Sequence, residues 1–170
     1  MMTIQIQPIE PLQVTEAKRV ILSVARNIFQ WQESLDEVIK RFDEQGDLLD
    51  VDNPQTHYFD RQGLFLVALD QGRVIGTGAI RRLDGDAAEL KRLWLLEAYQ
   101  GHGIGYQLMQ TLLRFAQTTG YRRIRLQTDR KQDRAIRFYK RVGFQPIKCD
   151  SDDPDDICME MVLSPFAQCS

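Results

Sequence analysis

The stretch "EAYQGHGIGYQLM", from Glu97 to Met109, places glycines at positions 101, 103 and 105 and then continues as an apolar run with helical spacing. Glycine costs roughly 0.5–1 kcal/mol relative to alanine inside a helix or strand, so this spacing indicates a backbone shape or close approach that a side chain would prevent. The first N–H groups of a helix have no partners within the helix and lie at the positive end of its dipole. The stretch therefore predicts a loop that wraps an anion at the start of a helix.

Two familiar phosphate-binding loops do not fit this stretch. A Walker loop needs lysine and then serine or threonine after its last glycine, but Gly105 is followed by Tyr106 and Gln107. The dinucleotide fingerprint G-x-G-x-x-G would need glycine at position 106 or 108, where Tyr106 and Leu108 stand. The pattern that does fit is Q-x-x-G-x-G, which begins at Gln100.

The composition is that of an ordinary globular protein. The chain has 170 residues, of which 43% are hydrophobic and 27% charged, so we expect a single domain over residues 1–170 with a sizeable core. The net charge of −2 gives no reason to expect a nucleic-acid partner. No apolar run reaches the ~18 residues of a membrane span, and the N-terminus lacks a basic region before an apolar stretch. We therefore expect no membrane association and no signal peptide.

The cysteines indicate a compartment. Cys149, Cys158 and Cys169 make an odd count, and no two of them form a C-x-x-C pair. Disulfides are rare in the reducing cytosol, so the simplest interpretation is a cytoplasmic protein with free thiols.

The N-terminal part of the chain predicts one strand and two helices. Alternation indicates a strand at Thr3–Ile9, and apolar residues at helical spacing indicate helices at Val14–Phe29 and Ser34–Glu44. The segment Gly46–Gly63 has a breaker at Asn53-Pro54 and is expected to be a loop. It is long for a connection, which suggests a role in binding.

The rest of the chain predicts an α/β fold. Two β-rich runs flank Asp70-Gln71-Gly72 as in a hairpin, and a third strand follows at Ala88–Leu96. Further elements are expected in this order: a helix at Ile104–Gln117 ended by Gly120, a strand at Tyr121–Thr128, a helix at Asp133–Gly143, and closing strands in "FQPIKC" and "ICMEMVL". The helix after the glycine loop would cross between two parallel strands. The sequence thus predicts a mixed, mostly antiparallel sheet of about seven strands with flanking helices.

Two separate motifs resemble one family. The strand, Q-x-x-G-x-G loop and helix in "AELKRLWLLEAYQGHGIGYQLM" are similar to the pyrophosphate loop of the GCN5-related N-acetyltransferase (GNAT) family. "DRAIRFYKRVGF", from Asp133 to Phe144, is similar to that family's second signature, A-x-x-x-Y-x-x-x-G-F. The resemblance implies the GNAT fold, acetyl-CoA as co-substrate, no metal, and direct transfer of the acetyl group to a primary amine.

The resemblance also implies a set of residues that bind acetyl-CoA. The diphosphate would lie on the main-chain N–H groups of Gln100, Gly101, His102, Gly103, Ile104 and Gly105, with the Gln100 side chain as an additional contact. Many family members have arginine at the position of Gln100, so some charge is lost here. His102 could donate a hydrogen bond to a phosphate or simply face solvent.

Three further residues complete this expected set. The pantetheine arm would pair with the main chain of Leu93 and Leu95, while their side chains pack in the core. An amide N–H near Leu93 would also polarise the thioester carbonyl. Gln132 stands where the family often has asparagine, and it could make the same amide contacts from a longer side chain.

Two residues are candidates for catalysis. The resemblance assigns Tyr139 the protonation of the departing thiolate; the alternative is a core aromatic residue. Glu89 stands where several family members have a catalytic glutamate, and by strand alternation we expect it to share a face with Lys91 and Leu93. It would take the proton from the amine, or else it is a structural glutamate paired with Lys91 or an arginine.

An acidic run lies near the C-terminus. "CDSDDPDDIC" contains five aspartates, but their spacing is not that of a calcium-binding loop. It could be a solvated hairpin tip, or it could draw a cationic amine towards the site.

These observations predict an N-acetyltransferase whose acceptor is a small-molecule amine, and they leave a homodimer open as its assembly. The alternatives are a protein or peptide acetyltransferase and a non-catalytic acyl-CoA-binding module. A closed pocket roofed by Gly46–Gly63 would favour a small molecule, and an open groove would favour a protein acceptor.

Overall fold

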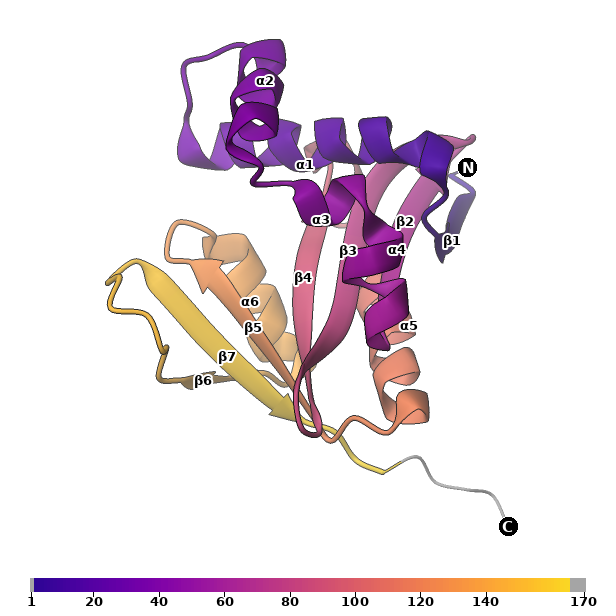
Figure 1. Ribbon diagram of the computed structural model, residues 1–170, viewed down its shortest axis with the longest axis vertical. Coiled ribbons are helices and arrows are strands. Elements are labelled where there is room, and N and C mark those ends of the chain that lie inside the picture. The colour runs from indigo at the N-terminus through magenta and orange to yellow at the C-terminus, as the bar shows by residue number, and fades with distance from the viewer. Residues whose placement is uncertain (1, 166–170) are drawn as a thin grey trace.

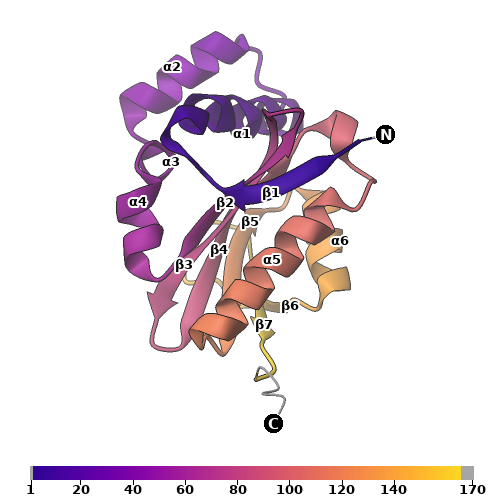
Figure 2. The ribbon, with the colours of Figure 1, turned by 90° about the vertical axis from the view of Figure 1, so that its right-hand side faces the viewer.

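The computed structural model describes residues 2–165 as a twisted seven-stranded sheet with helices on both faces (Figure 1). Helices α1 to α4 cover one face, and helices α5 and α6 cover the other (Figure 2). The strand order is β1-β2-β3-β4-β5-β7-β6. Among these residues, no helix has both the length and the apolarity needed to cross a membrane.

The first strand and the first two helices match the sequence-based expectation. Strand β1 spans Ile4–Pro8, and a short 3₁₀ turn, Pro11–Gln13, leads into α1 at Val14–Phe29. Helix α2 spans Leu35–Gln45. It begins with a capping box, in which Ser34 accepts a hydrogen bond from the amide of Glu37 and the Glu37 carboxylate accepts one from the amide of Ser34.

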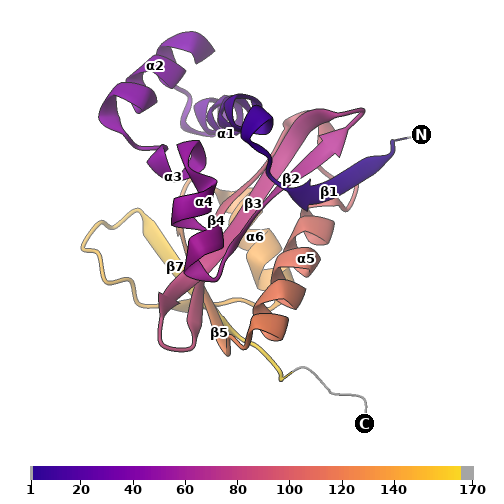
Figure 3. The ribbon, with the colours of Figure 1, turned by 45° about the vertical axis from the view of Figure 1, so that its right-hand side comes forward.

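The segment between α2 and the sheet is not the plain loop that the sequence suggested. It contains two short helices, α3 at Leu49–Asp52 and α4 at Pro54–His57, and then a 3₁₀ turn at Phe59–Arg61. These helices lie against β3 and β4 (Figure 3). Each is too short to show helical periodicity, and what holds the segment is burial of three apolar side chains in the core: Leu48, Val51 and Tyr58.

The sheet is built from a meander and a crossover, as expected. Strands β2 (Leu64–Asp70), β3 (Arg73–Asp84) and β4 (Ala87–Leu95) are antiparallel neighbours. A 3₁₀ turn (Glu97–Tyr99), helix α5 (Ile104–Thr119) and the parallel strand β5 (Arg123–Asp129) follow. The last elements are α6 (Asp133–Val142), β6 (Gln145–Ile147) and β7 (Asp156–Val162).

Strands β4 and β5 pair over a short stretch and then separate. Their parallel pairing joins Ala87–Glu89 of β4 to Arg123–Arg125 of β5, whereas β5 continues to pair with β7 as far as Asp129. Figure 1 shows the two strands diverging from a common end. Among residues 2–165, the carboxyl half of β4 therefore has no strand partner on its β5 side.

A bulge in β4 turns the side chain of Leu93 to the face of the sheet opposite to the one expected from simple alternation. Lys91 pairs with Ala79 and Trp94 with Thr77, so Arg92 and Leu93 together lie opposite one residue of β3. Arg92 has a left-handed backbone, with φ of 57°. The bulge places Leu93 with Leu90 in the core beneath α5, so Leu93 and Glu89 lie on opposite faces, contrary to simple alternation.

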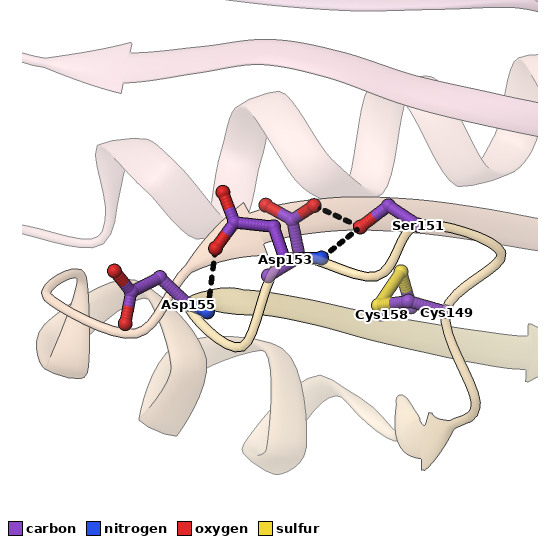
Figure 4. The surroundings of a disulfide bond; sticks show 6 residues. Cys149, Ser151, Asp153, Asp155 and Cys158 are labelled. Carbon is purple, nitrogen blue, oxygen red and sulfur yellow. Dashed lines mark hydrogen bonds between the residues drawn. A yellow bond between two sulfur atoms is a disulfide. The ribbon is translucent and has the colours of Figure 1, made fainter.

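The expectation of free thiols is wrong for two of the three cysteines. Cys149 and Cys158 form a disulfide across the β6–β7 connection (Figure 4). The register of the hairpin places Ile147 opposite Cys158, which brings Cys149 next to it, and this register has no local sequence signal. The thiol argument for a cytoplasmic location therefore does not hold at these positions; Cys169 lies outside the described residues.

The acidic run forms a turn that is closed by its own hydrogen bonds. The Ser151 hydroxyl donates to the Asp156 carboxylate, and the Asp155 amide donates to Asp153 (Figure 4). The amide of Arg130, at the end of β5, donates to the carbonyl of Asp155. Within residues 2–165, no group of three or more acidic, histidine or cysteine side chains could hold a metal ion.

Candidate active site

A cavity of about 900 Å³ lies beside the unpaired half of β4. Helix α1, the end of β4, the glycine loop, the start of α5 and one face of α6 line it. Seven of the residues predicted from the sequence come together here: Leu93, Leu95, Gln100, Gly101, Gly103, Gly105 and Gln132.

The glycine loop has the backbone shape that the sequence suggested. Gly101 and Gly103 adopt left-handed conformations, with φ of 82° and 79°. Gly103 caps the N-terminus of α5 without any side-chain hydrogen bond. A Cβ atom at Gly103 would meet no atom within 4 Å, so the left-handed conformation, and not crowding by the chain, accounts for this glycine. Gly103 and Gly105, at the start of α5, line the cavity, and the unpaired amides of a helix N-terminus suit an anion.

Gln100 lines the cavity, whereas His102 does not. The Gln100 side chain donates a hydrogen bond to the carbonyl of Leu95 at 3.0 Å, so it ties the loop to the end of β4. His102 lines a separate, smaller hollow together with Met2, Ile4, Ile104 and Gln107. The side chain of Ile104 is buried in the core, which leaves only its main chain for the loop.

Tyr139 lies beneath the cavity. Its neighbours Phe138 and Val142 belong to the lining, but Tyr139 itself packs in the core with its ring edge-on to Phe144. Its hydroxyl forms no hydrogen bond with another of the described residues. Burial raises the pKa of this hydroxyl well above its ordinary value, so it carries its proton at neutral pH.

Glu89 lies outside the cavity lining, at the point where β4 and β5 separate. Its carboxylate is 3.4 Å from Nε of Arg81 and 3.9 Å from Nζ of Lys91. Burial lowers the pKa of Lys91, and the neighbouring Glu89 carboxylate opposes that shift. The pairing with Lys91 or an arginine, which was the alternative to a catalytic role, is therefore present with both Arg81 and Lys91, on the face of the sheet that α1 to α4 cover.

Sequence reasoning missed four cations that line the cavity. Lys131 precedes α6, and Arg134, Arg137 and Arg141 follow along one face of that helix. None of the four forms an ion pair with another described residue. The spacing i, i+3, i+7 in "DRAIRFYKRVG" is a signal that could have found the three arginines. Together with the N-terminus of α5, these cations make the cavity suited to a polyanion.

The family model for the acetyltransferase (GNAT) family matches residues 25–144 of the chain. An uncharacterized N-acetyltransferase of Mycobacterium tuberculosis is 36% identical over 86 residues, which are 51% of this chain and 55% of that protein. The chain thus spans about half the length of that relative. An IAA acetyltransferase of Azospirillum brasilense is 30% identical over 143 residues, or 78% of this chain and 92% of that protein.

Solved structures agree in fold. A GNAT-family acetyltransferase from Staphylococcus aureus has a TM-score of 0.81 and 25% identity, and the match covers 95% of this chain and all of that one. The PaiA N-acetyltransferase of Thermoplasma acidophilum, solved in complex with coenzyme A, has a TM-score of 0.77 at 22% identity over 95% of this chain and 99% of that one. The expected fold and resemblance are confirmed, and the chain belongs to the GNAT family of acetyltransferases.

Proposed function

We propose that this protein is an acetyl-CoA-dependent N-acetyltransferase that transfers the acetyl group directly to the primary amine of a small molecule. The observation that carries the proposal is one cavity lined by the glycine loop, the unpaired half of β4 and the cationic face of α6. The structural neighbour from Thermoplasma acidophilum, which was solved with coenzyme A, supports the same ligand.

The lining fits the parts of acetyl-CoA in turn. The amides from Gln100 to Gly105 would take the diphosphate, and the cations of α6 would balance the charge of the phosphates. Beyond Glu89, β4 does not pair with β5, so the main chain of Leu93 and Leu95 is proposed to pair with the amides of the pantetheine arm, with the Leu95 carbonyl also accepting a hydrogen bond from Gln100. Gln132 lines the same cavity and is proposed as a further contact.

The bound co-substrate would supply an activated acetyl group as a thioester. The N–H of Leu93 would stabilise the negative charge that develops on the carbonyl oxygen when the amine attacks. Glu89 is the proposed base for the ammonium proton, directly or through water. Tyr139, which burial keeps protonated, is the proposed acid for the departing thiolate.

The proposed acceptor is a small amine with an apolar body. Val24, Ile28 and Trp94 make the α1 end of the cavity apolar, which favours such a molecule. No residue of Gly46–Gly63 lines the cavity, so this segment offers no roof of the kind that was expected to favour a small acceptor. A protein or peptide acceptor and a non-catalytic acyl-CoA-binding module remain the alternatives; a homodimer and a cytoplasmic location remain predictions.

A screen of amines with acetyl-CoA tests this function. Release of free thiol that depends on one amine, together with acetylated product by mass spectrometry, is the expected result. Acetyl-CoA should also raise the melting temperature, because it binds only the folded protein. Stabilisation without turnover for any amine or peptide would favour the binding module, and the absence of both effects would contradict the proposal.

A further inference from the structure

A buried ion pair joins the segment after α2 to the bulge of β4. The Asp50 carboxylate accepts two hydrogen bonds from Arg92, at 2.7 Å from Nη2 and 3.0 Å from Nε. The Tyr58 hydroxyl also donates to this carboxylate, at 2.5 Å. Only 10% of the Asp50 side chain and 20% of the Arg92 side chain are exposed, so the pair is largely shielded from water.

Hydrogen bonds fix both the side chain and the main chain of Arg92. Its guanidinium is bound by Asp50 and by the carbonyl of Asp47, while its own carbonyl accepts a hydrogen bond from the buried Thr77 hydroxyl at 2.6 Å. This matters because a φ of 57° is sparsely populated by residues other than glycine. Without these contacts, the arginine would favour a negative φ.

The conformation of Arg92 decides where the next residues lie. A regular β4 strand would turn Leu93 to the other face of the sheet, because a shift of one residue reverses every side chain that follows. With the bulge, the side chains of Leu93 and Leu95 pack against the core beneath α5, and both residues line the cavity. The shape of this wall therefore depends on a residue whose side chain lies on the opposite face of the sheet.

We propose that Asp50 is a positioning residue for acyl transfer: by binding Arg92 it holds the β4 bulge, and so holds the main chain of Leu93 where the pantetheine arm and thioester would meet it. The proposal rests on the assignment of the cavity to acetyl-CoA. It also gives the segment Gly46–Gly63 a role, since Asp50 of this segment binds Arg92 on the face of the sheet opposite to Leu93.

Two substitutions of Arg92 separate the effect of the bulge on ligand binding from the effect of the ion pair. Arg92→Ala and Arg92→Gly both remove the guanidinium and leave Asp50 without its partner. Glycine adopts a positive φ readily, whereas alanine does not. A positioning role predicts that Arg92→Gly retains function that Arg92→Ala loses, while a role in ion pairing alone predicts equal losses. If these single variants fold poorly, each Arg92 substitution is combined with Asp50→Asn. The double variants leave no buried carboxylate without a partner.

The measurement is calorimetric binding of acetyl-CoA and of adenosine 3′,5′-bisphosphate, which lacks the pantetheine arm. Arg92→Ala should weaken acetyl-CoA on the order of tenfold, the effect of about one lost hydrogen bond, and leave the nucleotide unchanged. Arg92→Gly should bind acetyl-CoA nearly as well as the parent. As a control, Asp86→Asn removes another ion pair, with Arg123 at the far end of β4, and should change neither affinity.

Equal weakening by alanine and glycine would overturn the positioning role, as would an equal loss for both ligands. A parent protein that binds the nucleotide and acetyl-CoA, but whose Arg92→Ala variant binds both normally, would also overturn it while leaving the proposed function intact. A parent that binds neither ligand would instead overturn the proposed function, and the positioning role with it.

Discussion

At the scale of single residues, the proposed acid role of the Tyr139 hydroxyl can be tested directly. Phenylalanine would keep the ring and its packing against Phe144. If Tyr139 donates a proton to the thiolate, Tyr139→Phe should lower turnover by a factor on the order of 10² or more, with acetyl-CoA affinity nearly unchanged. Steady-state kinetics and calorimetry check this. A thioester with a more acidic thiol should recover part of the rate, and a fully active variant would exclude the acid role.

Glu89 gives a second prediction at this scale. If its carboxylate is the base, Glu89→Gln should lower the rate at neutral pH and remove the acidic limb of the pH–rate profile. The matched control is Glu160→Gln on β7, since Glu160 is also half-buried and bound to an arginine, Arg125, at 2.6 Å. Similar profiles for the parent and Glu89→Gln would mean that water or another residue takes the proton.

At the scale of elements, the loop before α5 can be tested against a turn of the same shape. Gly103 and Gly72 have φ of 79° and 78°, and a Cβ atom at either would meet nothing within 4 Å. Valine should therefore cause similar backbone strain at both positions, roughly 1–2 kcal/mol. Only Gly103→Val should abolish the rise in melting temperature caused by acetyl-CoA, because Gly72 lies in the β2–β3 turn. Loss of that rise in both variants, or in neither, would contradict the loop assignment.

At the scale of the whole molecule, Asp50 links stability to pH. Burial alone would raise its pKa, but the hydrogen bonds and charge of Arg92 hold the pKa at about 2, below the usual value of 3.8 for an aspartate. A carboxyl whose pKa is lowered by folding contributes stability above its unfolded pKa and loses it as the pH falls towards 2. This contribution is roughly 2 kcal/mol at neutral pH.

Thermal or urea unfolding between pH 7 and pH 2 checks this prediction. The parent should lose this part of its free energy of unfolding between about pH 4 and pH 2. Asp50→Asn should be less stable at neutral pH and should show a shallower fall over the same range. Parallel curves for the two proteins would show that other carboxyls carry the acid sensitivity.

Local patterns in the sequence determined the long elements and the position of the glycine loop before α5. The helices α1, α2 and α5 follow from apolar residues at helical spacing. Gly120 and Gly143 end α5 and α6, because glycine accepts the backbone that a helix end requires. The spacing of Gly101, Gly103 and Gly105 likewise indicated a loop before a helix, whereas the left-handed conformations of Gly101 and Gly103 are seen only in the structure. These features depend on residues close together in the chain, so the order of residues is enough to predict them.

Tertiary structure alone decided the wall of the cavity, the disulfide and the short helices after α2. The bulge at Arg92 reversed the expected face of Leu93, and the contact that holds it comes from Asp50, 42 residues earlier. Cys149 and Cys158 meet because two strands adopt a particular register. In each case the deciding energy comes from burial and pairing between distant residues, and no local pattern carries that information.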